Sequence, residues 1–128
     1  MTLLAAVGNA NAKSFALAAT LSGSAAVPPQ ATDAFGAARF SYDSDTRELN
    51  YCVTYEGLPA AKAEIHGPAD PGRNAPVVIP FPAPQSPVGG TMILSRAQGA
   101  ELLAGKWYVQ ARGQDHAAAT IRGQIERE

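Results

Sequence analysis

The chain has 128 residues, which is enough for one domain with a single hydrophobic core. Its 10 Lys and Arg residues balance 11 Asp and Glu residues, so the formal net charge is −1, and no block of like charge stands out. A nucleic-acid or acidic-membrane surface would need a clustered basic face, so the charge balance argues against both. Abundant Gly, Pro, Ala, Val and Thr favour many short strands separated by turns over a helical bundle.

The first dozen residues, MTLLAAVGNANA, are small and apolar, and no Lys or Arg precedes them. Ala10-Asn11-Ala12 matches the A-x-A pattern read by signal peptidase. Three interpretations stay open: the tail of an export signal that starts upstream, a disordered start, or a first strand. We therefore divide the chain into a signal-like or disordered segment at 1–13 and a single domain at 14–128. No other stretch approaches the roughly 18 consecutive apolar residues of a membrane span.

Period-two alternation predicts the first strands of the domain. Apolar residues alternate with small or hydroxylated ones over residues 14–21, and a loop with Pro28 and Pro29 follows. The clearest hairpin pairs residues 38–42 with residues 49–55 through four turn-forming residues at 43–46. We expect the tyrosines of this hairpin to stabilise the sheet as cross-strand aromatics.

Cys52 is the only cysteine and cannot form an internal disulfide. It lies within the alternating run of the hairpin's second arm. We expect it to be a buried free thiol that packs as a small apolar residue.

The second half of the domain predicts further short strands and one helix. Strands are expected at residues 62–66, 76–81, 91–94, 106–111 and 119–125, with the proline-bracketed 76–81 run at a sheet edge or briefly buried. A helix is expected near residues 95–104, with Ser95 as its N-cap and Gly105 at its stop. Trp107 is expected in the core. About seven to nine short strands and one helix predict an all-β fold, an immunoglobulin-like or Greek-key β-sandwich.

The segment AEIHGPADPGRN, residues 63–74, carries the only candidate chemistry. Side chains two residues apart on a strand share a face, so Glu64 and His66 should point together while Ile65 points into the core. Gly67, Pro68, Pro71 and Gly72 then take the chain into a tight loop. A lone histidine at a strand end can equally serve as a hydrogen-bonding residue that holds such a loop.

Five motifs in order make the chain resemble the CHRD domain family, named for chordin and widespread in bacterial exported proteins. They are LSGS with VPP (21–29), the hairpin, IHGPADPG followed by PVV (65–78), the helix ending LLAG with a following YV (102–109), and IRGQI (121–125). The resemblance implies an immunoglobulin-like sandwich and secretion. It implies little about biochemical function, although chordin itself points to extracellular protein binding.

The resemblance also implies a candidate metal site, from which this chain departs. Many family members resemble HIHGPA at the loop and NVHT on a later strand, a histidine set suited to copper or zinc. Here Glu64 and Arg112 occupy two of the three histidine positions and only His66 remains, with His116 able to stand in for a lost ligand. The alternative is a structural ion pair between Glu64 and Arg112. We expect Arg122 to tie loop carbonyls or a carboxylate such as Glu64 or Asp70, and Asp70 to be a solvated loop residue.

Three functional hypotheses follow from these residues. The first is a non-enzymatic, exported module of the cell envelope, periplasmic or extracellular, that binds an unknown protein or envelope component or serves a structural role. The second is a copper- or zinc-binding protein that uses His66, Glu64 and His116. The third is a hydrolytic or redox enzyme in which the Glu64 and His66 pair acts as general base. No nucleophile and base occur at a recognisable catalytic spacing, so no catalytic residue and no organic cofactor are predicted.

Overall fold

The computed structural model describes residues 13–58, 62–82, 86–113 and 119–128. Residues 1–12 of the predicted signal-like segment and His116 lie outside these residues. Nine strands, one α-helix and one 3₁₀ turn make up the described part. They are β1 (Ser14–Ser22), η1 (Gly23–Ala25), β2 (Phe35–Asp43), β3 (Glu48–Glu56), β4 (Lys62–His66), β5 (Val77–Pro80), β6 (Val88–Ile93), α2 (Arg96–Leu103), β7 (Tyr108–Arg112), β8 (Thr120–Gln124) and β9 (Glu126–Arg127).

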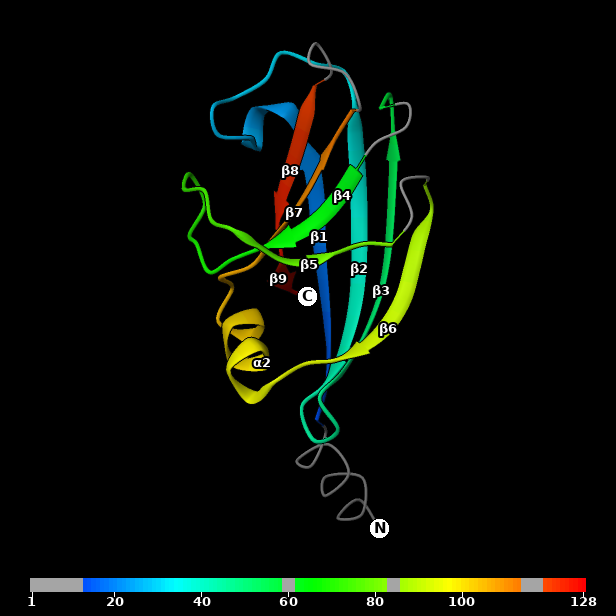
Figure 1. Cartoon of the computed structure of the whole chain (residues 1–128), viewed down its shortest axis with the longest axis vertical. Helices are drawn as coiled ribbons and strands as arrows, with labels where there is room; N and C mark the ends of the chain where they lie inside the picture. The colour runs from blue at the N-terminus through cyan, green and yellow to red at the C-terminus, as the bar shows by residue number, and fades with distance from the viewer. Residues whose placement is uncertain (1–12, 59–61, 83–85, 114–118) are drawn as a thin grey trace.

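All strands belong to one antiparallel sheet with the order β5-β4-β7-β8-β1-β2-β3-β6, and β9 pairs with β1. In Figure 1, β4 and β5 cross over the longer strands β1 and β2, and α2 lies near the lower end of the sheet. The fold is thus mostly β, as predicted, with one helix. The expected two-sheet Greek-key sandwich is not confirmed, because the β8 and β1 pairing joins both halves into a single curled sheet.

The β2–β3 hairpin has the predicted turn. Tyr42 pairs with Leu49, and the register continues unbroken to Phe35 and Glu56. The turn is held by Asp43, whose Oδ1 accepts from the amides of Asp45 at 2.8 Å and Thr46 at 3.1 Å. These two bonds lower the pKa of the Asp43 carboxyl below its usual value. The short polar side chain therefore replaces a missing backbone partner in the turn.

The prediction of a buried Cys52 is wrong, because its thiol is exposed. The inward face of β3 carries Leu49 and Val53, both fully buried. Cys52 lies one residue out of phase with them, so it points to the solvent face with Asn50 and Thr54.

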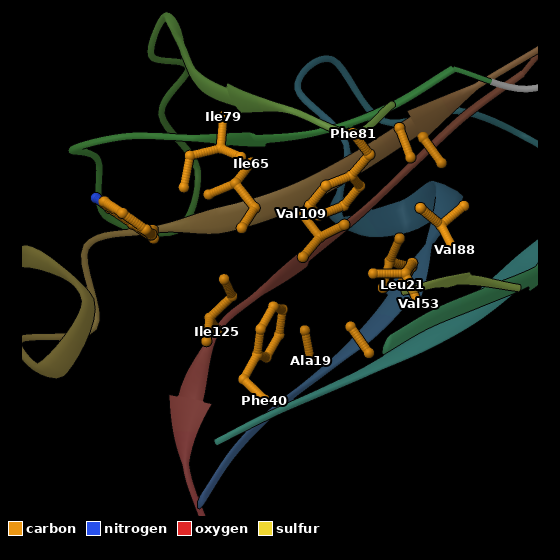
Figure 2. Packing of buried hydrophobic residues seen from close by; sticks show 14 of the residues in the cluster. Ala19, Leu21, Phe40, Val53, Ile65, Ile79, Phe81, Val88, Val109 and Ile125 are labelled. Atoms are coloured by element: carbon orange, nitrogen blue, oxygen red, sulfur yellow. The ribbon is translucent and has the colours of Figure 1, made fainter. Parts of the chain in front are cut away.

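The core lies between the two halves of the curled sheet. Figure 2 shows Ile65, Ile79 and Val109 pointing toward the strands that carry Ala19 and Phe40. Trp107 is fully buried in this cluster, as predicted, and its indole nitrogen donates to Glu101 Oε1 at 2.9 Å. The inner sheet face is therefore apolar, and polar side chains of β4, β7 and β8 are left to the other face.

Helix α2 begins and ends where its capping residues predict. Ser95 Oγ accepts from the Gln98 amide, and the Gln98 side chain accepts from the Ser95 amide, which forms a capping box. Gly105 ends the helix with a φ of 78°, a conformation that glycine adopts at little cost. No helix among the described residues has the length and apolar character needed to cross a membrane.

Candidate functional site

Three neighbouring strands place nine polar or aromatic side chains on the outer face of the sheet, which we call the polar face. The register aligns Lys62 with Arg112 and Thr120, then Glu64 with Gln110 and Arg122, then His66 with Tyr108 and Gln124. Directly opposed residues share a face, so these three rows form one continuous surface. Ile65, Val109 and Ile121 alternate with them and are buried in the core.

Glu64 and His66 contact each other on this face, and both are buried, with 4% and 8% of their surface exposed. His66 Nε2 lies 3.0 Å from Glu64 Oε1, and Nδ1 lies 2.8 Å from the Ala75 carbonyl oxygen. A carbonyl only accepts, so Nδ1 carries a proton. Glu64 and the Ala75 carbonyl thus hold the imidazole through its two ring nitrogens.

His66 is the first member of an aromatic and cationic stack. Its ring lies parallel to the ring of Tyr108, with centroids 5.0 Å apart. The guanidinium of Arg122 also stacks on Tyr108, with its carbon 3.5 Å from the Tyr108 ring centroid. Arg122 is only 1% exposed, and burial lowers the pKa of its guanidinium. Cation–π attraction therefore replaces part of the hydration that Arg122 loses on folding.

The stack supports the loop at residues 67–76, which we call the 67–76 loop. The Tyr108 hydroxyl accepts from the Ala75 amide at 2.9 Å and donates to the Ala75 carbonyl at 3.2 Å. Arg122 donates to the Asp70 carbonyl at 3.3 Å and to Asn74 Oδ1 at 3.4 Å. Gln124 donates to the carbonyls of Ala69 and Gly105. Both ends of the loop are thus anchored to the polar face.

The exposed side of the loop has one ion pair of its own. Lys106 Nζ donates to Asp70 Oδ1 at 2.5 Å, and this bond holds the pKa of the Asp70 carboxyl below its usual value. The Asp70 side chain stays exposed, as expected for a loop residue. Arg122 therefore reaches the loop through the Asp70 carbonyl oxygen and leaves the carboxylate to Lys106.

Arg112 is exposed and does not approach Glu64 as an ion-pair partner. Glu64 is paired with His66, and Arg112 lies opposite Lys62, one row away from Glu64. It lines a pocket of about 250 Å³ beside His66 and Tyr108. The ion pair expected between Glu64 and Arg112 is thus replaced by the pair between Glu64 and His66.

The described residues do not assemble the donors of a metal centre. Both nitrogens of His66 already have partners, and no group of three or more His, Cys, Asp or Glu side chains gathers there. Zinc sites in proteins are usually four-coordinate, so Glu64 and His66 alone do not fit one. His116, the third expected ligand, lies outside the described residues.

Sequence reasoning missed Tyr108 and Gln124 as residues that hold the loop. Alternation along the predicted strand at residues 106–111 puts Tyr108 and Gln110 on one face, but nothing local shows that this face lies against the 67–76 loop. The usable signal was period-two alternation, since Tyr108, Gln110 and Arg112 alternate with the buried Val109 and Ala111.

The fold and its site define a class: a small antiparallel β domain that anchors a Gly- and Pro-rich loop on one polar sheet face. A family model described as CHRD domain matches residues 17–125, nearly the whole chain. The chain belongs to the CHRD domain family. Neither the curated proteins nor the solved structures contain a significant match to it.

Proposed function

We propose that the protein is a non-enzymatic binding or structural module that is exported to the periplasm or the cell exterior. In this proposal, the exposed side of the 67–76 loop contacts a protein or envelope component. Export is supported by the signal-like start of the chain and by the family resemblance, whose bacterial members include many exported proteins.

The main support for this proposal is that side chains of the polar face anchor the 67–76 loop from its inner side. Four side chains of the polar face form hydrogen bonds with the loop backbone. They are His66, Tyr108, Arg122 and Gln124. The upper surface of the loop, including Pro68, Asp70, Pro71, Gly72 and Arg73, remains exposed. A surface that is already ordered loses less conformational entropy when a partner binds, so such a loop is suited to recognition.

The copper- or zinc-binding alternative lacks a matching donor set in the described residues. Glu64 Oε1 lies 3.0 Å from His66 Nε2, and a metal ion would have to break that contact to bind. The pair is better explained as a support for the loop, since it orients the imidazole whose Nδ1 holds Ala75.

Site-specific photo-crosslinking in cells that produce the protein tests the binding role. A crosslinking amino acid at exposed Arg73 should give a discrete adduct, whereas the same residue at Arg39 on β2 should not. The Gln124→Ala variant loses the bond to Ala69 of the loop and the bond to Gly105, so it should lower the adduct yield at residue 73 while the β-sheet circular dichroism is retained. Equal adducts at positions 73 and 39, or none at 73, would contradict the proposal.

A further inference from the structure

A pocket of about 250 Å³ lies at the end of the polar face that carries Arg112 and Thr120, and Asn74 and Ala75 of the 67–76 loop also line it. Its walls come from β7 and β8, from His66 and from the loop around Val27 and Pro28. Among the described residues, the lining contains no carboxylate, and Arg112 is its one lysine or arginine. The volume is near the lower end of the roughly 300–1,000 Å³ typical of ligand sites, so only a small ligand fits.

Two cations are placed together at this end of the face. Lys62 and Arg112 are directly opposed across the β4 and β7 pairing, and both are exposed. Neither forms an ion pair or a side-chain hydrogen bond within the described ranges 13–58, 62–82, 86–113 and 119–128. Like charges directly opposed on a sheet destabilise the pairing, whereas an anion between them would reverse the sign of the interaction.

The pocket also contains hydrogen-bond donors that the fold does not use. Thr120 is directly opposed to Arg112, and Gln110 is two residues from Arg112 on the same face. The structure shows no hydrogen bond from the side chains of Gln110 or Thr120 to any described residue. By contrast, the Asn74 side chain donates to the Val27 carbonyl, and the Tyr108 hydroxyl is hydrogen-bonded to the amide and the carbonyl of Ala75. One guanidinium, one amide and one hydroxyl therefore remain available to a ligand.

We propose that this pocket binds a small oxyanion, a phosphate or a carboxylate, with Arg112 as its principal ligand. Guanidinium groups bind planar or tetrahedral oxyanions through two parallel hydrogen bonds, and Gln110 and Thr120 supply neutral donors beside them. Lys62 contributes charge at the rim. The Glu64 carboxyl hydrogen-bonds His66 Nε2 at 3.0 Å and is not among the residues that line the pocket. The site is independent of the macromolecular contact proposed for the 67–76 loop.

Amide chemical-shift titrations of the ¹⁵N-labelled full chain test the proposal with inorganic phosphate and, separately, with succinate. Sodium chloride keeps the ionic strength constant, so general screening is the same at every point. At least one probe should give saturable shifts centred on Gln110, Arg112 and Thr120. The Arg112→Gln variant should weaken the binding about tenfold or more, since it removes the charge-assisted bonds. Lys62→Gln should weaken it less.

The matched control is Arg39→Gln, which removes one exposed positive charge from β2 and lies outside the pocket lining. It should leave the affinity unchanged. Phosphate-only or succinate-only binding would each support the site and identify its preferred oxyanion. The proposal is overturned if neither probe gives saturable shifts in these residues, or if Arg39→Gln weakens binding as much as Arg112→Gln.

Discussion

Arg122 shows how a buried cation can be used without a carboxylate partner. Its three hydrogen-bond acceptors among the described residues are the neutral oxygens of Asp70, Asn74 and Gln124, and its flat face lies on Tyr108. Burying a charge without a charged partner costs free energy, so the stacking on Tyr108 and the hydrogen bonds of the guanidinium nitrogens must both stabilise Arg122. Lysine has neither the plane nor the fork, although it carries the same charge.

We therefore expect Arg122→Lys to lower the free energy of unfolding by about 2 kcal/mol. Urea denaturation followed by the fluorescence of Trp107, the single and fully buried tryptophan, measures this change. Arg39→Lys is the control, because Arg39 is exposed on β2 and its substitution should change stability by no more than about 0.5 kcal/mol. Equal stability of the two variants would show that charge alone suffices at position 122.

At the scale of elements, the contact between β8 and β1 closes the curled sheet. Ser22 pairs with Arg122, and β9 continues the contact at Leu17 and Ala18. Gly123 lies within this junction. A Cβ atom there would be 2.3 Å from the Thr20 carbonyl oxygen, which is backbone and cannot rotate away. The absence of a side chain at Gly123 thus allows β8 to approach β1.

The Gly123→Ala substitution should force the two strands apart and lower the free energy of unfolding by about 3 kcal/mol. Thermal and urea denaturation measure the loss. Gly89→Ala on edge strand β6 is the matched control, since its Cβ atom would be 3.3 Å from the nearest atom, the Tyr51 carbonyl oxygen. We expect a change of no more than about 1 kcal/mol there. Similar losses in both variants would contradict the role assigned to the junction.

At the scale of the whole molecule, two exposed carboxylates make stability depend on acid pH. The turn amides lower the pKa of Asp43, and Lys106 lowers the pKa of Asp70. A carboxyl group with a lower pKa in the folded state stabilises the fold above its unfolded pKa, near 3.9. This contribution is lost as the pH falls through the folded pKa.

The double variant Asp43→Asn/Asp70→Asn should accordingly be less stable than the wild type at about pH 6, and the difference should shrink below about pH 3. Urea denaturation at several pH values gives the difference, and NMR titration of the carboxyl carbons gives the two pKa values directly. A stability difference that stays constant down to about pH 2.5 would mean that the lowered pKa values are not its cause.

Local physics made much of this protein predictable from its sequence. Period-two alternation predicted β1, the β2–β3 hairpin and β4, and it also placed Glu64 and His66 on one face. Ser95 and Gly105 predicted the bounds of α2. Each of these features depends on residues within a few positions of one another, so the chain's own chemistry determines them.

Only the tertiary structure decided how these elements combine. The pairing of Ser22 with Arg122 joins residues 100 positions apart and makes one curled sheet where a two-sheet sandwich was expected. The same closure brings Tyr108 between His66 and Arg122 and leaves Arg112 opposite Lys62 instead of Glu64. Such contacts depend on strand order and register, which arise from packing of the whole core and leave no short-range pattern in the sequence.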